Sequence, residues 1–150
     1  MSQRTVCIIG VGNRDRGDDG VGSLLAERLA RRHCGPIIDA GAVPENHLER
    51  VARAGSDTVL IIDAVDFGGD PGECRLLDPH QMGPSGLSSH ALSLAMTAEY
   101  LKARTQARLA LLAIQPVDIR PGSALSDSVS RAAQMAEGAV SCILEGSDYA

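Results

Sequence analysis

The chain has 150 residues, a formal net charge of −5, 44% hydrophobic residues and only 2% aromatic ones. This length suits one domain over residues 1–150, and its core must be aliphatic because Trp is absent and Phe occurs once. A net negative chain with so few aromatic rings is a poor partner for nucleic acid or for an anionic membrane surface.

The sequence also bears on the compartment. The N-terminus lacks the pattern of a signal peptide, and no apolar run approaches the roughly 20 residues of a membrane span. The cysteines form no CxxC pair, which favours free thiols in a reducing compartment; they are Cys7, Cys34, Cys74 and Cys142. We therefore expect a soluble, cytoplasmic monomer without membrane insertion.

Short apolar runs alternate along the chain with stretches of helical spacing. The elements predicted, in chain order, are a strand over Thr5–Ile9, a helix over Asp19–Arg32, a strand over Pro36–Asp39, a helix from Pro44 to about Ala54, a strand over Thr58–Ile62, an edge strand over Glu73–Leu77, a polar loop over Gln81–Ser89, a helix over Ala91–Lys102, a strand over Leu109–Ile114 and a helix over Ser126–Leu144. Ser126 is the predicted N-cap of the last helix. This alternation predicts a single three-layer α/β/α domain around a mostly parallel twisted sheet.

Ligands of such sheets bind beyond the carboxyl ends of the strands, so polar residues at those ends are the candidates for a site. The glycine-rich turn after the first strand carries Asp18 and Asp19, where a phosphate would meet like charge. One aspartate suffices to cap the helix, which leaves the other available for function. Asp63 ends the strand over Thr58–Ile62 and is either an Asx-turn residue or a site carboxylate. His90, before the helix at Ala91, is either a capping residue or a ligand.

Two carboxylates and one imidazole from Asp19, Asp63 and His90 would suit a divalent metal ion with open coordination positions. Only the predicted fold brings these three residues together, since they are far apart in the sequence. Two other sites are excluded by residue type. A dinucleotide fingerprint needs a glycine where Asp15 stands, and the G-x-S-x-G motif of a serine hydrolase does not occur.

An ordered set of motifs runs along nearly the whole chain. Its segments are Gly10–Asn13, Gly17–Gly22, Asp39–Asn46, Leu60–Asp66, Asp70–Glu73, Ser88–His90 and Ala113–Pro116. The set resembles the motifs of the nickel–iron hydrogenase maturation endopeptidases, and the turn Pro44–Glu45–Asn46 is most similar to the branch that processes the hydrogenase 3 type of formate hydrogenlyase systems. The charged stretch Arg14–Asp15–Arg16 departs from the family, which usually has apolar residues there.

The resemblance implies a protease that removes a C-terminal extension from a hydrogenase large-subunit precursor after nickel insertion. It implies that Asp19, Asp63 and His90 are the metal ligands and the catalytic groups of an aspartic or metal-dependent peptidase. With Asp19 assigned as a ligand, we expect Asp18 to be the cap of the first helix. We expect the precursor to supply the nickel as a recognition element, and we expect no nucleotide or flavin. Asn13 and Gln115 are candidates for substrate binding, although both could instead brace loops.

Two other functions remain open at this point. The first is a flavodoxin-like module that binds a nucleotide or a flavin, which a yellow cofactor or stabilisation by FMN or ATP would identify. The second is a metal chaperone that uses the same three ligands without cleaving a peptide. Stoichiometric metal transfer without cleavage would identify the chaperone.

Overall fold

The structure, a computed structural model, describes residues 4–81 and 90–147. Its elements are β1 (Val6–Val11), the 3-10 turn η1 (Gly17–Gly20), α1 (Val21–Arg32), β2 (Ile37–Gly41), the 3-10 turn η2 (Pro44–His47), α2 (Leu48–Ala54), β3 (Thr58–Ala64), β4 (Cys74–Leu77), the 3-10 turn η3 (Pro79–Gln81), α3 (Ala91–Arg104), β5 (Arg108–Ile114) and α4 (Asp127–Ser147). Each predicted strand and helix is confirmed, with small shifts of its ends. The predicted polar loop at 81–89 lies outside the described residues except for Gln81.

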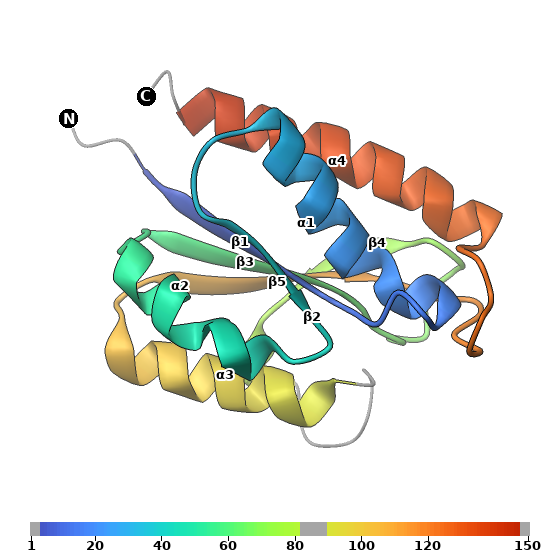
Figure 1. Ribbon diagram of the computed structural model, residues 1–150, viewed down its shortest axis with the longest axis horizontal. Helices are drawn as coiled ribbons and strands as arrows, with labels where there is room; N and C mark the ends of the chain where they lie inside the picture. The colour runs from blue at the N-terminus through green and yellow to red at the C-terminus, as the bar shows by residue number, and fades with distance from the viewer. Residues whose placement is uncertain (1–3, 82–89, 148–150) are drawn as a thin grey trace.

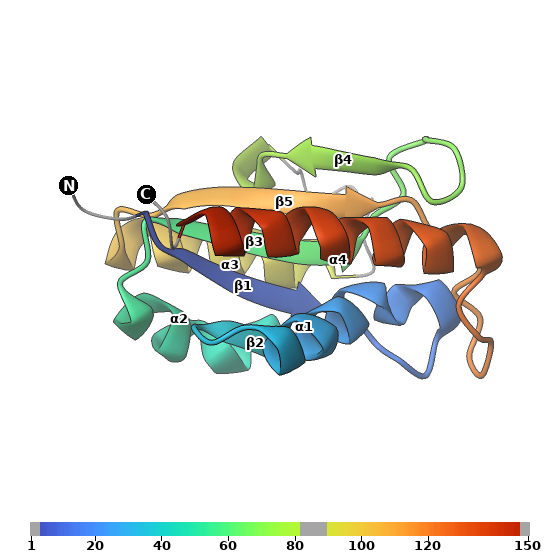
Figure 2. The ribbon, with the colours of Figure 1, turned by 90° about the horizontal axis from the view of Figure 1, so that it is seen from above.

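The described residues form one five-stranded sheet in the order β2-β1-β3-β5-β4. The three neighbouring pairs among β2, β1, β3 and β5 are parallel, whereas β4 runs antiparallel to β5 at the edge of the sheet. Helices α1 and α4 cover one face and helices α2 and α3 cover the other, as Figure 1 shows, and Figure 2 shows the strands side by side from β4 to β2. The three-layer α/β/α fold with a mostly parallel sheet is therefore confirmed.

Two apolar clusters form the core, one on each face of the sheet. On β3, Val59 and Ile61 belong to the cluster under α2 and α3, whereas Ile62 and Ala64 belong to the cluster under α1 and α4. Successive side chains of a strand point to opposite faces, so Asp63 follows Ile61 onto the face of α2 and α3. The strand thus delivers a carboxylate into the layer where α3 begins.

Helix α1 packs directly against the backbone of the sheet at a glycine. A methyl group at Gly22 would overlap the carbonyl oxygens of Val11 and Ile62, which belong to β1 and β3. Across the same contact, a methyl group at Gly10 would overlap the carbonyl oxygen of Gly22 and the Cβ of Ala26. This close approach holds η1, and with it Asp19, at the carboxyl end of the sheet.

The four cysteines are free thiols, as predicted. Cys7 is buried in β1, and burial raises the pKa of its thiol to about 11, with a smaller opposing effect from the charge of Arg50. Cys34, Cys74 and Cys142 are exposed. Within residues 4–81 and 90–147, no helix is long and apolar enough to cross a membrane.

Candidate active site

Three of the predicted site residues lie at the carboxyl end of the sheet. Asp19 lies in η1 directly after the β1 turn, Asp63 lies near the end of β3, and His90 directly precedes α3. The Nε2 atom of His90 lies 3.3 Å from Oδ2 of Asp19, and the two side chains are 10% and 4% exposed. Asp63 is fully buried. The topology therefore brings a carboxylate and an imidazole into contact although they are 71 positions apart in the sequence.

The surroundings of His90 are strongly acidic. Its pKa is raised above the usual value, first by its hydrogen bond with Asp19 and then by the negative charges of Asp63, Asp19 and Glu45, while burial acts in the opposite direction. The nearby carboxylates thus favour a positive charge beside Asp19. A protonated imidazole or a divalent cation would each supply such a charge.

The donor set of Asp19, Asp63 and His90 suits a divalent cation, because carboxylate oxygens and imidazole nitrogens are ligands for several transition metals. In the described part of the chain, no three His, Cys, Asp or Glu side chains are already arranged around one metal position. The assignment of the three residues as metal ligands and as catalytic groups therefore remains a prediction.

Asn13 lies between Asp19 and a cavity. Its backbone N–H donates to the carbonyl oxygen of Asp19 at 3.2 Å and lies 3.4 Å from Oδ2 of the same residue. Its side-chain Oδ1 accepts a hydrogen bond from the N–H of Asp15 at 2.9 Å, which is an Asx turn. The adjacent cavity has a volume of about 600 Å³ and is lined by Gly12, Asn13, Arg14, Ser23, Asp39, Ala40, Gly41 and Ala42. A role for Asn13 in substrate binding remains a prediction, and its position beside this cavity is compatible with it.

Gln115 braces the loop that follows β3. Its Oε1 accepts hydrogen bonds from the N–H groups of Phe67 and Gly69, both at 3.0 Å, and its Nε2 donates to Oδ1 of Asp66 at 3.0 Å. The hydrogen bond from Gln115, followed by one from the N–H of Gly68, lowers the pKa of Asp66. The loop-bracing alternative thus accounts for the contacts of this amide, and a role for Gln115 in substrate binding remains a prediction.

Replacing Gln115 with Ala is expected to lower the free energy of unfolding by about 1–3 kcal/mol, because two partly buried backbone N–H groups lose their acceptor. The matched control is Gln134→Ala on the exposed face of α4, where a change within about 0.5 kcal/mol is expected. Urea denaturation of both variants measures the difference. Equal stability of the two variants would contradict the bracing role.

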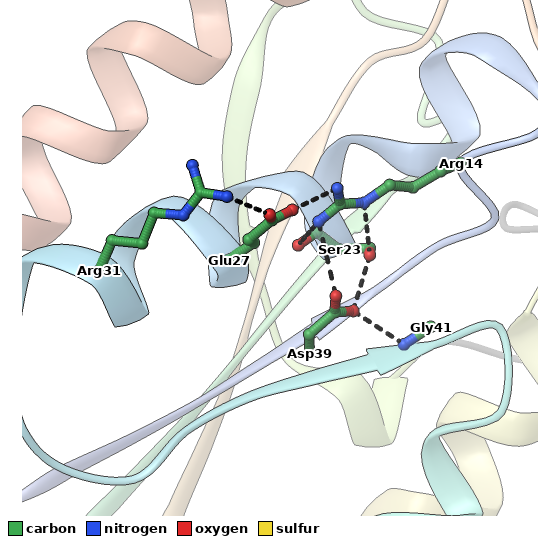
Figure 3. Close-up of polar contacts among 6 residues, drawn as sticks. All are labelled: Arg14, Ser23, Glu27, Arg31, Asp39 and Gly41. Carbon is green, nitrogen blue, oxygen red and sulfur yellow. Dashed lines mark hydrogen bonds and ion pairs between the residues drawn. The ribbon is translucent and has the colours of Figure 1, made fainter.

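Arg14, the first residue of the charged stretch Arg14–Asp15–Arg16, reaches side chains of α1 and β2 (Figure 3). Arg14 donates from Nε to Oγ of Ser23 and from Nη2 to the carbonyl oxygen of Ser23, both at 2.9 Å. Arg14 also forms ion pairs with Glu27 and, at 3.5 Å, with Asp39, whose Oδ1 accepts from the Ser23 hydroxyl at 2.6 Å. The Arg14 side chain is thus held by contacts with α1 and β2. It also lines the cavity beside Asn13.

Sequence reasoning missed Arg14, Ser23 and Asp39 as residues of this cavity. Asp39 had a usable signal, because it ends the predicted strand over Pro36–Asp39 and so lies at the same edge of the sheet as Asp63. Ser23 had none, since it lies within a helical pattern. Its pairing with Asp39 depends on how α1 packs against β2.

The expectation that Asp18 caps α1 is wrong. Neither η1 nor α1 has a side-chain cap, because the 3-10 turn η1 precedes α1 and directs the Asp18 carboxylate toward the segment between β5 and α4. Ser126 is confirmed as the N-cap of α4, since its Oγ accepts from the N–H of Val129 at 3.3 Å. The same hydroxyl donates to Oδ2 of Asp18 at 2.9 Å.

Comparison with known proteins gives consistent matches. The family model of the hydrogenase maturation protease HycI matches residues 21–143, a range that includes Asp63 and His90 and begins just after Asp19. The hydrogenase 3 maturation protease of Escherichia coli K12 is 36% identical over 115 residues, which is 75% of this chain and 73% of that protein.

Solved structures agree with the sequence matches. The crystal structure of the NiFe hydrogenase maturation protease HycI from Thermococcus kodakarensis superposes with a TM-score of 0.88 at 31% identity, covering 96% of this chain and 94% of that one. The hydrogenase maturating endopeptidase HybD from Escherichia coli superposes with a TM-score of 0.78 at 25% identity, covering 95% and 93%. The likeness therefore extends over the whole fold, including the part after Pro116, where the last of the resembling motifs ends.

Proposed function

Because the chain belongs to the hydrogenase maturation protease family, we propose that it removes the C-terminal extension from the large-subunit precursor of a NiFe hydrogenase after nickel insertion. The observation that carries the proposal is the buried contact between Asp19 and His90 beside Asp63, at the edge of the sheet where parallel α/β folds bind ligands. The similarity to the hydrogenase 3 maturation protease favours a precursor of that type.

In this proposal, nickel is part of the substrate and serves as the recognition element. The negative charges around His90 attract a cation, and Asp19, Asp63 and His90 offer two carboxylates and an imidazole to the open positions of the precursor's metal. Affinity for the precursor would then exist only after the metal has been inserted. This dependence makes cleavage a checkpoint on assembly.

Peptide hydrolysis needs a polarised carbonyl and an activated water. Asp19, Asp63 and His90 would hold the precursor's metal ion, which would supply the first by withdrawing electrons from the carbonyl oxygen and would lower the pKa of a water. Asp19, Asp63 and His90 are the proton-transfer groups within reach of that water in the proposed mechanism. The cavity beside Asn13, with a volume of about 600 Å³, is the proposed place of the extended peptide.

The remaining parts of the proposal concern location and cofactors. The four free thiols favour the cytoplasm, where thiols stay reduced. The precursor is the proposed protein partner and the source of nickel, so the protease itself needs no resident nucleotide or flavin.

The test compares nickel-loaded and nickel-free precursor, each incubated with the purified protein and followed by mass spectrometry of the precursor's C-terminus. We expect loss of the extension from the loaded precursor alone, and its retention with Asp19→Ala or His90→Ala. Equal cleavage of the nickel-free precursor would contradict the checkpoint. Full cleavage by both variants would contradict the site, and metal transfer without cleavage would identify a chaperone.

A further inference from the structure

The carboxylate of Asp18 is fully buried and accepts hydrogen bonds from one segment far along the chain. Its Oδ2 accepts from the N–H groups of Val117 at 2.9 Å and Asp118 at 3.0 Å, and from the Ser126 hydroxyl at 2.9 Å. Its Oδ1 accepts from the N–H of Ser126 at 2.7 Å. Both ends of the segment between β5 and α4, called here the 117–126 loop, are therefore fastened to a single side chain.

Further contacts join the same loop to the turn before α1. The N–H of Asp18 donates to the carbonyl oxygen of Asp118 at 2.9 Å, and the N–H of Gly122 donates to that of Asp15 at 2.7 Å. Nε of Arg16 donates to the carbonyl oxygen of Ile119 at 3.2 Å. The turn that carries Asp19 is thus held along its length by the 117–126 loop.

Gly17 shows how closely the two segments fit. Its φ of +55° lies in the left-handed region, and a methyl group there would overlap the Ser123 hydroxyl and come within 2.5 Å of the Asp118 carbonyl oxygen. The turn therefore has little room to move against the loop. Asp19 follows Asp18 directly in the four-residue turn η1, so the backbone that aims the Asp19 carboxylate at His90 is the backbone held by Asp18.

We infer that Asp18 is a positioning residue, which uses the 117–126 loop as a fixed support to aim Asp19 at His90. The inference deepens the proposed function. Only the cleavage measurement in its test depends on that function, whereas the hydrogen-exchange measurement does not. A carboxylate is suited to this task because it accepts from several donors at once, whereas an amide at the same place would turn a donor toward donors. The adjacent aspartates then have separate tasks, one holding the turn and the other facing the site.

The experiment uses two serines of the α4 region as a matched pair. Ser126→Ala removes the hydroxyl that donates to Asp18, whereas Ser141→Ala removes a buried hydroxyl that lies 2.9 Å from Nε2 of His33, near the other end of the helix. Amide hydrogen exchange of residues 17–20 and the kcat/KM for nickel-loaded precursor are measured in both. Ser126→Thr, which keeps the hydroxyl and the helix cap, is the rescue variant.

We expect Ser126→Ala to speed exchange in η1 and to lower kcat/KM by about tenfold, the size typical of losing a group that orients a ligand. Ser141→Ala should match the wild type in both readouts, and Ser126→Thr should recover most of the loss. Asp18→Asn should show a larger effect than Ser126→Ala in both readouts, because it alters the acceptor of all four hydrogen bonds. Equal behaviour of the two alanine variants, or unchanged exchange in η1, would overturn the inference. A wild type that cleaves nothing would instead refute the proposed function and leave the exchange readout intact.

Discussion

Replacing Asp63 with Asn is expected to slow cleavage of the nickel-loaded precursor by at least about 100-fold while the protein stays folded. The amide has the shape of the carboxylate but neither its negative charge nor its capacity to accept a proton. Asp63 is fully buried, and a neutral amide is cheaper to bury than a charge, so stability is expected to stay close to that of the wild type. Initial cleavage rates and urea denaturation measure the two effects separately.

The control for this variant is Asp66→Asn, the same substitution three residues later on an exposed loop. The Asp66 carboxylate accepts from Gln115 and from the N–H of Gly68, and it serves the loop rather than the site. We expect its cleavage rate to stay within about threefold of the wild type, the scale of a surface change. A fast Asp63→Asn protein would remove Asp63 from the proposed mechanism.

Replacing Gly22 with Ala is expected to lower the free energy of unfolding by at least about 3 kcal/mol. Alanine ordinarily stabilises a helix interior by about 1 kcal/mol relative to glycine, so the sign is reversed here. The reversal follows from the two backbone carbonyl oxygens, of Val11 and Ile62, that occupy the place of the new methyl group. Neither can move without displacing a central strand. Chemical denaturation followed by circular dichroism gives the change.

Gly138→Ala on α4 is the matched control for this variant, because a methyl group there meets no atom within 4 Å. We expect this variant to be unchanged or more stable by up to about 1 kcal/mol. If both alanine variants gained stability, the close approach of α1 to the sheet described above would be wrong.

Much of the fold could be predicted because the local signals agree with the final packing. The run Thr58–Ile62 is apolar and rich in branched side chains, so it is a buried central strand, and Asp63 follows at its carboxyl end. The same logic placed Asp19 and His90 at one edge of the sheet, where Asp19 and His90 are in contact. Residue type together with strand position was sufficient for this part.

The separate tasks of Asp18 and Asp19 could not be predicted, because both suit the first turn of a helix equally well. The difference arises from Val117, Asp118 and Ser126, whose donors reach Asp18 only after β5 and α4 are in place. For the same reason, the sequence showed that Gln115 is a polar residue at a strand end. It could not show that the loop after β3 surrounds the Gln115 amide. Long-range hydrogen bonds of this kind leave no local pattern.

The order of the site residues and their supporting elements along the chain has a consequence during protein synthesis. All three site residues, Asp19, Asp63 and His90, precede β5 in the chain. However, β5 is one of the two neighbours of β3 in the sheet, and the donors to Asp18 come from the 117–126 loop. A ribosome delivers the N-terminal part of a chain first. A chain that has emerged only as far as α3 therefore carries all three side chains but not the strand and loop that order them. The proposed site is therefore expected to form only after β5 and the 117–126 loop have been synthesised, late in translation.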